Sequence, residues 1–251
     1  MIAPTAVVHA GARLGRNVRI GHGTIVHANV ELGDDVQVDE FCVLGHPTGS
    51  ARPPLRVGKG SLIRSHSVLY EGSTLGERFE SGHHVLVREN TTAGANLRLG
   101  GQCMVQGDCT IGDYVRLHSA VQVGKGCNIG NFVWIFPAVT LTNDPLPPSS
   151  VEQGSTLEDG VVVCTGSIVM PGTRLGAGVF VAAGSRASGD VPAGKVVDGR
   201  NGEVTGDVHR LLSLEHGLRH PWMNHFTRGY PPEALPRIEA LKRKLQDLRG
   251  K

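Results

Sequence analysis

A few residues in the middle of the chain have side chains that could move a proton during a reaction. His83, His84 and His118 carry imidazole groups, which change protonation near neutral pH and can act as general bases. Glu89 could relay a proton in the same way, and Asn143 is a further polar candidate. Whether these side chains can cooperate depends on the elements that position them.

A strict six-residue repeat determines how those residues are placed. An aliphatic or small residue returns at every sixth position, and the series is broken once, at Ser81. The positions are Val57, Ile63, Leu69, Leu75, Val87, Ala93, Leu99, Val105, Ile111, Leu117, Val123, Ile129, Ile135 and Leu141. Helices and ordinary strands lack this period, but a triangular coil with three short strands per turn has it. The sequence therefore predicts an all-β solenoid with inward aliphatic side chains.

The same spacing continues in both directions along the chain. The upstream positions are Val8, Leu14, Ile20, Val26, Leu32, Val38 and Leu44, and the downstream positions are Leu157, Val163, Val169, Leu175 and Val181. Together these runs predict nine coils, which would form a prism roughly 43 Å long at a strand spacing of about 4.8 Å. A single coil is a poor core, so stability must come from stacking.

Residues 18 positions apart lie above one another in such a stack. One predicted column near a corner contains Glu71, Glu89, Gly107, Lys125 and Asn143. A second column places His118 on the same edge as the Gly82–His83 turn. Function is one interpretation of these polar columns. Simple solvation of a corner is the other, and a corner histidine can be purely structural.

The repeat is interrupted twice, and loops at such interruptions often carry function. The first interruption predicts a projecting loop near residues 45–56, because the segment from Gly45 to Pro54 offers no inward aliphatic residue. The second predicts a loop over residues 142–156, which contains three prolines. We expect the second loop to be the better candidate for a functional site.

The composition of the chain changes after the repeat ends. We expect a β-helix domain over residues 1–200 and a helical C-terminal cap over residues 201–251. Within the cap, one short helix is predicted from Asp207 to Gly217 and a second from Pro232 to Leu248, where leucines recur at helical spacing. Large aromatic residues are concentrated between them. The tail is predicted to cover the open end of the prism.

The charge and hydropathy of the chain argue against several classes of protein. A formal net charge of +2, with no basic run interleaved with aromatic residues, argues against nucleic-acid binding. No apolar run approaches 18 residues and the first residues lack a leader pattern, so we expect a cytoplasmic protein that does not bind membranes. The five cysteines include no C-x-x-C pair, and packing explains them better than zinc or disulfides.

The sequence resembles the hexapeptide-repeat acyltransferases over roughly residues 8 to 200. Several segments resemble the branch that N-acetylates nucleotide-linked amino sugars. They are Gly82-His83-His84-Val85, Arg88-Glu89-Asn90, Thr142-Asn143-Asp144-Pro145, Gly176-Ala177-Gly178, Ala182-Ala183-Gly184-Ser185 and Asp190-Val191-Pro192. The chain departs from the branch at Gly199-Arg200-Asn201-Gly202, where Gly-Asn-Pro-Ala is common, and this affects the last expected contacts with coenzyme A (CoA).

This resemblance implies a left-handed parallel β-helix that assembles as a homotrimer. It also implies an acetyl-CoA-dependent N-acetyltransferase acting on a UDP- or dTDP-linked amino sugar, with no metal. By resemblance, CoA would contact Gly166 and Ala183, with its phosphates near Arg186 and Lys195. The residues expected to be catalytic are Asn143, His118, His83 and Glu89. Those expected to contact the sugar nucleotide are His84, Arg64, Arg88 and Asp144, the two arginines because of their charge and position.

Three other interpretations remain open on the sequence alone. An O-acetyltransferase or another small-molecule acyltransferase is the nearest alternative. Zinc carbonic anhydrases share the prism, but they carry a second histidine five residues after the first, where this chain has Val123 after His118. A non-catalytic scaffold is the third alternative, because a fold does not establish chemistry.

Overall fold

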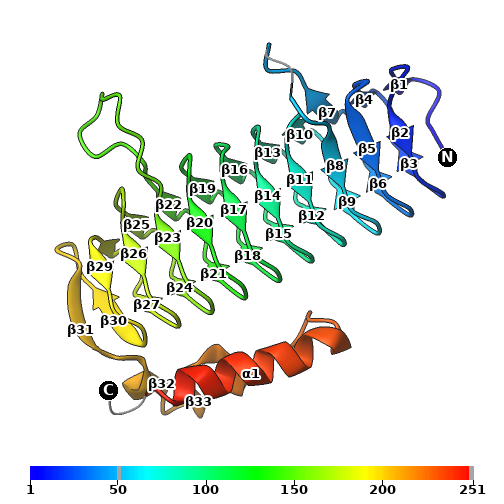
Figure 1. Ribbon diagram of the computed structural model, residues 1–251. Helices are drawn as coiled ribbons and strands as arrows, with labels where there is room; N and C mark the ends of the chain where they lie inside the picture. The colour runs from blue at the N-terminus through cyan, green and yellow to red at the C-terminus, as the bar shows by residue number, and fades with distance from the viewer. Residues whose placement is uncertain (50–51, 249–251) are drawn as a thin grey trace.

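The computed structural model describes residues 1–49 and 52–248. It is a parallel β-solenoid whose short strands form three long faces of a prism, followed by a tail with one short α-helix (Figure 1). Within each face, successive strands from β1 to β30 pair in parallel with the strand three places later in the chain, and β31 joins the third sheet as an antiparallel partner of β30. The predicted fold class, an all-β solenoid with a helical tail, is therefore confirmed.

Each face is a sheet that runs the length of the prism. The first face contains β1 (Val7–Val8), β4 (Ile25–Val26), β7 (Val43–His46), β10 (Val68–Tyr70), β13 (Leu86–Val87), β16 (Met104–Val105), β19 (Gln122–Val123), β22 (Thr140–Leu141), β25 (Ile168–Val169) and β28 (Arg186–Ala187). The second contains β2 (Arg13–Leu14), β5 (Val30–Leu32), β8 (Leu55–Val57), β11 (Thr74–Leu75), β14 (Thr92–Ala93), β17 (Thr110–Ile111), β20 (Asn128–Ile129), β23 (Thr156–Leu157), β26 (Arg174–Leu175) and β29 (Asp190–Val191). The third contains β3 (Arg19–Ile20), β6 (Gln37–Val38), β9 (Leu62–Ile63), β12 (Glu80–Ser81), β15 (Arg98–Leu99), β18 (Arg116–Leu117), β21 (Trp134–Ile135), β24 (Val162–Val163), β27 (Phe180–Val181), β30 (Lys195–Asp198) and β31 (Glu203–Asp207).

The strands of the described ranges form ten coils, one more than the nine predicted. The tenth coil places Ala187, Val191 and Val197 in the core. In this coil the spacing between inward residues shortens from six residues to four between Ala187 and Val191. A prediction based on a constant spacing of six therefore ends one coil early. The repeat positions themselves are confirmed, because each contributes an inward side chain to one continuous apolar core.

The turns between successive strands form three edges, which join the faces. The first edge joins the first face to the second, for example at residues 88–91. The second edge joins the second face to the third at residues 94–97, and the third edge joins the third face back to the first at residues 100–103. Residues 18 apart pair across coils, as Leu86 does with Met104, so each edge carries aligned columns of side chains.

Both predicted loops are present, and both project from the first edge (Figure 1). One joins β7 to β8 and the other joins β22 to β23; residues 50 and 51 of the first loop lie outside the described residues. Glu71 anchors the first loop, since its carboxylate accepts hydrogen bonds from the backbone N–H and hydroxyl of Thr48 and from the side chain of Asn29. Burial alone would raise the pKa of Glu71, but these bonds hold it below its usual value.

The tail begins with β31, which pairs antiparallel with β30 and covers the last strand of the third face. The helix predicted over residues 207–217 is wrong. That segment forms a 3₁₀ turn, η1 (Val208–Arg210), followed by a hairpin of β32 (Leu212–Ser213) and β33 (Leu218–Arg219). The leucines there do not share a buried helical face, and Leu214 is 88% exposed.

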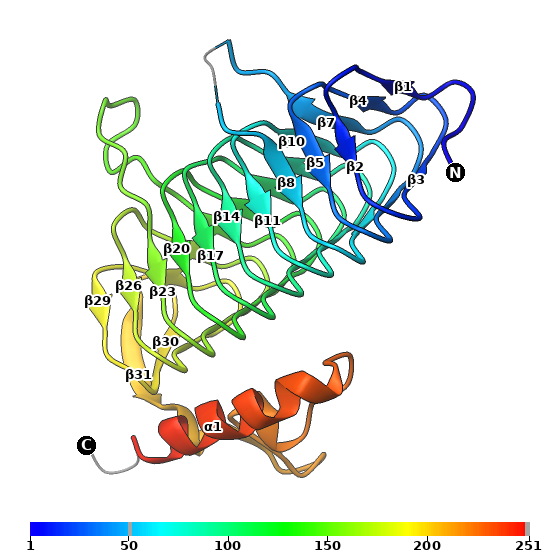
Figure 2. The same cartoon turned by 45° about the vertical axis from the view of Figure 1, so that its right-hand side comes forward.

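The second predicted tail helix is confirmed. Two 3₁₀ turns, η2 (Trp222–Asn224) and η3 (Pro232–Ala234), precede α1 (Leu235–Gln246). The helix lies along the second edge in both views (Figures 1 and 2). Thus β31 covers one strand at the end of the prism, while the rest of the tail covers its side, contrary to the expectation of an end cap.

Close packing holds α1 against the second edge. Gly178 has a φ of +66°, and a Cβ atom at this position would lie 2.6 Å from a methyl carbon of Leu245. Glycine therefore meets both a conformational and a steric requirement here. An ion pair of 2.7 Å between Arg237 and Asp113 fixes the register of the helix further along the same edge.

A charge placed inside the prism should disrupt the stack. Val105 in β16 has no exposed surface, so Val105→Asp would bury an unpaired carboxylate and should lower the free energy of unfolding by at least about 4 kcal/mol. Urea denaturation followed by circular dichroism measures this loss. Thr110→Asp on the exposed side of β17 is the matched control and should change stability by less than about 0.5 kcal/mol. Equal losses for both variants would contradict the role given to the inward ladder.

Candidate functional site

The structure divides the predicted site residues between two edges of the prism. The third edge carries one group, namely Arg64, His83, His84, His118, Gly166 and Ala183. The first edge carries the other, namely Arg88, Glu89, Asn143 and Asp144. Arg186 starts β28 on the first face and Lys195 starts β30 on the third. Within one chain, the candidate catalytic histidines are therefore separated from Glu89 and Asn143.

On the first edge, the candidate side chains are engaged in local structure. Arg88 and Glu89 form an ion pair of 2.7 Å. The backbone of Asn143 accepts a hydrogen bond from the N–H of Gln153 and closes the base of the second loop. Asp144 accepts bonds from Ser149 and from the N–H of Leu146, and the Ser149 hydroxyl is the main cause of its lowered pKa. Their assignment to catalysis or binding stays a prediction.

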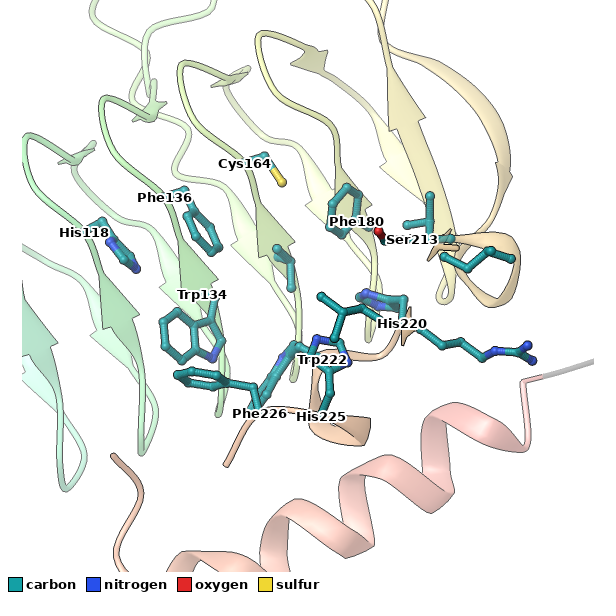
Figure 3. Close-up of a pocket in the computed structure, with 15 residues that line it drawn as sticks. His118, Trp134, Phe136, Cys164, Phe180, Ser213, His220, Trp222, His225 and Phe226 are labelled. Atoms are coloured by element: carbon teal, nitrogen blue, oxygen red, sulfur yellow. The ribbon is translucent and has the colours of Figure 1, made fainter. Parts of the chain in front are cut away.

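The third edge borders an apolar groove of about 770 Å³ between the prism and the tail (Figure 3). Its prism wall consists of outward side chains of the third face and the third edge, and its outer wall is formed by residues 211–226. The lining residues are His118, Trp134, Phe136, Val162, Cys164, Phe180, Leu211, Leu212, Ser213, Leu218, Arg219, His220, Trp222, His225 and Phe226. Such a surface is suited to a long hydrocarbon or an aromatic ligand.

His118 lies at one end of the apolar groove. Its ring stacks on Phe136, with 4.7 Å between centroids and an interplanar angle of 12°, and Trp134 lies beside it. Burial lowers the pKa of His118, because charging the ring among apolar neighbours is unfavourable. The imidazole is therefore neutral at physiological pH and able to accept a proton.

A second, more polar groove of about 500 Å³ continues from the same point. It shares His118, Trp134 and Phe226 with the apolar groove. Its other lining residues are Arg64, Glu80, Ser81, Gly82, His83, Arg98, Leu99, Gly100, Arg116, Leu117, Ser119, Arg228 and Gly229. The structure thus brings together three of the predicted residues, Arg64, His83 and His118, around one pair of connected grooves.

His83 has a defined hydrogen-bonding partner in the polar groove. The hydroxyl of Ser65, one coil below, lies 2.8 Å from Nδ1 of His83. This contact restrains the ring and leaves Nε2 available for another partner. His84 instead stacks on His66, with 4.8 Å between ring centroids, which is a packing role.

The residues expected to contact CoA are spread over several coils. Gly166 and Ala183 are exposed turn residues on the third edge, beyond His118. Arg186 is exposed on the first face, whereas Lys195 lies 3.6 Å from the carboxylate of Asp207 in β31. No contact in the structure joins these four residues into one site, so their role with CoA stays a prediction.

Sequence reasoning missed the aromatic walls of the apolar groove. The chain has few aromatic residues, and five of them line this groove: Trp134, Phe136, Phe180, Trp222 and Phe226. Positions 134, 136 and 180 point outward from coils whose other outward residues are mostly small or polar. Large aromatic residues at outward positions of the repeat were the available signal, because exposed rings need a covering element or a ligand.

The described part of the chain has no candidate metal site and no candidate membrane-spanning helix. Among residues 1–49 and 52–248, no group of three or more histidine, cysteine or acidic side chains is placed to hold a metal ion. Over the same ranges, no helix is both long enough and apolar enough to cross a membrane.

Comparison with known proteins finds short stretches of similarity in sequence. No protein-family model matches the chain. Over 87 residues it is 32% identical to the acyl-[acyl-carrier-protein]–UDP-N-acetylglucosamine O-acyltransferase of Rickettsia canadensis, covering 30% of this chain and 33% of that protein. Over 82 residues it is 34% identical to the bifunctional protein GlmU of Herminiimonas arsenicoxydans, covering 29% of this chain and 18% of that protein. The matched part thus spans a third or less of these relatives.

Similarity to solved structures extends over the whole chain. A UDP-N-acetylglucosamine acyltransferase from Arabidopsis matches with a TM-score of 0.68 and 20% identity, over 99% of this chain and 96% of that one. A UDP-N-acetylglucosamine acyltransferase from Campylobacter jejuni matches with a TM-score of 0.52 and 18% identity, over 100% and 85%. At these identities the likeness shows the fold, so the resemblance to hexapeptide-repeat proteins is confirmed at that level.

The outer wall of the apolar groove contains a buried histidine. His220 is 8% exposed, its Nε2 has no hydrogen-bond partner in the described part of the chain, and its ring meets Phe180 edge-on. Burial lowers the pKa of His220 to about 4, and the nearby His209 and His225 contribute in the same direction. The tail therefore packs against the prism with His220 neutral.

The docking of the tail should weaken in acid because of His220. The pKa of His220 in the docked tail lies below the ordinary value of 6.5. Its contribution to the free energy of docking is therefore complete above about pH 6.5, and up to about 3 kcal/mol of that free energy is lost as the pH falls towards 4. Hydrogen exchange of residues 211–230, compared between wild type and His220→Leu, measures the effect. Protection in the wild type should fall about 100-fold more than in the variant between about pH 7 and pH 4.5. Parallel losses in the two proteins would show that other groups control docking.

Proposed function

We propose that this protein is an acyltransferase that moves an acyl group from a carrier thioester to a nucleotide-linked sugar. The observation that carries the proposal is the position of His118, where an apolar groove meets a groove rich in arginine. The apolar groove suits an acyl chain, and the arginine-rich groove suits a phosphorylated acceptor. A neutral general base is needed where the two grooves meet. The Rickettsia canadensis relative and the Arabidopsis neighbour, both acyltransferases of UDP-N-acetylglucosamine, support the same reaction class.

The apolar groove supports an acyl chain longer than acetyl. A two-carbon group would cover a small part of about 770 Å³ lined by Trp134, Phe136 and Phe180. A longer chain would bury these rings and gain stabilisation in proportion to the apolar area removed from water. The resemblance found in the sequence implies acetyl-CoA as the donor. A long-chain acyl thioester, on CoA or on a carrier protein, is the donor we favour.

In the proposed reaction His118 acts as general base. Its neutral imidazole takes the proton of the acceptor while the acceptor atom bonds to the thioester carbonyl carbon, which gives a tetrahedral oxyanion. Collapse of this intermediate breaks the carbon–sulfur bond, and the imidazolium returns the proton to the departing thiolate. Such a base typically contributes 10²- to 10⁴-fold. Backbone N–H groups at the third edge could stabilise the oxyanion.

The acceptor atom decides how much the reaction depends on His118. A hydroxyl keeps its proton at neutral pH and requires the base, whereas an amine is already partly unprotonated. The neutral, half-buried imidazole therefore favours a hydroxyl acceptor. N-acetylation of a nucleotide-linked amino sugar is the alternative that the sequence motifs favour.

A homotrimer would unite the two groups of candidate residues. The first face carries outward aliphatic side chains along much of its length, and Val7 and Ile168 are 49% and 43% exposed. Three copies around an axis parallel to the prism would bury these faces. Each copy's first edge would then meet the next copy's third edge, bringing Glu89 and Asn143 towards the neighbouring His118.

Replacement of His118 should abolish most of the turnover. We expect His118→Ala to lower kcat with the preferred acyl thioester and UDP- or dTDP-linked sugar by at least about 100-fold. Mass spectrometry of the product, over acetyl to tetradecanoyl donors and over hydroxyl and amino sugars, identifies both substrates. His216→Ala, at an exposed tail position, is the matched control and should retain wild-type turnover. Absence of turnover with every pair would refute the proposal and favour the scaffold interpretation.

A larger side chain in the apolar groove should shorten the preferred acyl chain. Cys164 is the half-buried cysteine of the groove, and Cys164→Phe would fill part of its volume. We expect kcat/KM for long-chain thioesters to fall about tenfold or more while that for short chains is kept. Cys164→Ser controls for loss of the thiol. An equal effect on short and long chains would place the acyl chain elsewhere.

A further inference from the structure

The polar groove contains a buried cation, Arg116, that forms no ion pair with the described acidic residues. Arg116 is 6% exposed, and its guanidinium donates to the backbone oxygens of Asn96 and Val115 and, at 2.6 Å, to the side-chain oxygen of Asn96. Among the described residues, no acidic group forms an ion pair with it. Burial lowers the pKa of Arg116 to about 10; the positive charge of Arg98 adds to this effect, and the nearby carboxylate of Glu80 opposes part of it.

A buried and uncompensated charge is costly, and proteins normally pair it or use it. Carbonyl dipoles and the ring of Tyr230, 4.7 Å from the guanidinium carbon, offset part of the cost. These groups supply no negative charge. An anion from outside the chain would complete the electrostatic balance of the groove.

The charged residues that line the groove are mostly positive. Its described lining residues include four arginines, Arg64, Arg98, Arg116 and Arg228, and one acidic residue, Glu80. Arg64 pairs with Asp39, outside the groove, at 3.5 Å, so among the described residues two of the four arginines, Arg116 and Arg228, have no ion pair. Glu80 pairs with Arg98 at 3.2 Å. Arg228 is exposed and has no ion-pair partner within the described ranges. The groove thus presents guanidinium donors to a space of about 500 Å³.

These cations belong to two different parts of the molecule. Arg98 and Arg116 extend from β15 and β18 of the prism, whereas Arg228 belongs to the tail. Arg116 also donates to the backbone oxygen of Gly229, at 3.4 Å, and lies against the ring of Tyr230. An anion held between Arg98 and Arg228 would therefore fasten the tail to the prism next to His118.

We propose that the polar groove is a diphosphate-binding site in which Arg98 and Arg228 contact phosphate oxygens and Arg116 acts as a positioning residue for residues 228–230. Guanidinium groups bind phosphate oxygens in bidentate geometry, and two arginines on opposite walls match the two phosphoryl groups of a diphosphate. The proposal rests on the proposed function only in assigning this diphosphate to the nucleotide-linked sugar. A donor such as CoA carries the same chemistry and is tested separately.

Occupation of this site should also order the wall of the apolar groove. Phe226 lines both grooves and lies two residues before Arg228. An anion that immobilises Arg228 would restrain Phe226 against Trp134, which its ring already meets edge-on at 5.6 Å. Binding of the acceptor would thereby complete the surface that receives the acyl chain.

Calorimetric titration with sodium pyrophosphate, UDP and CoA tests the site without any need for turnover. We expect pyrophosphate and UDP to bind the wild type, and Arg228→Ala to weaken both at least about tenfold, which is about 1.4 kcal/mol. Arg228→Lys should recover part of the affinity. Arg243→Ala, on the solvent side of α1, is the matched control and should bind like the wild type. CoA binding that depends on Arg228, with no UDP binding, would support the site but assign its diphosphate to the donor.

Hydrogen exchange supplies a readout that a merely structural arginine would not give. Pyrophosphate should slow exchange of residues 222–230 in the wild type and leave it unchanged in Arg228→Ala, although both free proteins exchange alike. Wild-type affinity in Arg228→Ala, or no binding of pyrophosphate, UDP or CoA to the wild type, would overturn the proposal. Anion binding without acyl transfer to any sugar would instead refute the proposed function and leave this site standing.

Discussion

Stacking of coils is the constraint on which the rest of this structure depends. Every strand of the prism forms its ladder with the coils above and below, and each inward aliphatic side chain is buried only because neighbouring coils cover it. The register is 18 residues over most of the prism, so an outward residue has a fixed height and a fixed edge. His118 faces a groove because the stack places it on the third edge beside Phe136, one coil further along.

The prism alone does not form the candidate site, because each of the two grooves has a wall that belongs to the tail. The concave surfaces arise where residues 211–230 of the tail lie against the third face. Trp134, Phe180 and Arg116 would otherwise be solvent-exposed outward residues. Their partners in the tail convert them into one apolar and one cationic wall, which meet at His118. The chemistry proposed here therefore depends on the contact between a rigid stack and a non-repetitive segment.

The difference between those two parts also explains what the sequence could predict. The periodicity predicted the fold, both loops and the shared edge of His83 and His118, because one rule relates each of these residues to all the others. A single four-residue step after Ala187 concealed the tenth coil. The tail follows no repeat, so local propensity suggested a helix over 207–217 where tertiary contacts produce a hairpin. Nothing local indicates that Trp222 and Phe226 meet Trp134, because that contact joins segments about 90 residues apart.

The packing of α1 along the second edge has a consequence for how proteins of this shape can vary. One helical turn rises about 5.4 Å, close to the strand spacing of about 4.8 Å, so successive turns can meet successive coils. Leu241 lies opposite Gly160, and Leu245 lies opposite Gly178 on the next coil. Successive turns of the helix are therefore in register with successive coils of the prism. Gain or loss of a whole coil beneath the helix would misalign these contacts. Arg78 forms an ion pair with Glu233, near the start of the helix, so a coil added before Arg78 would leave the contacts intact. Evolutionary change in the length of the prism should therefore be concentrated towards its amino-terminal end.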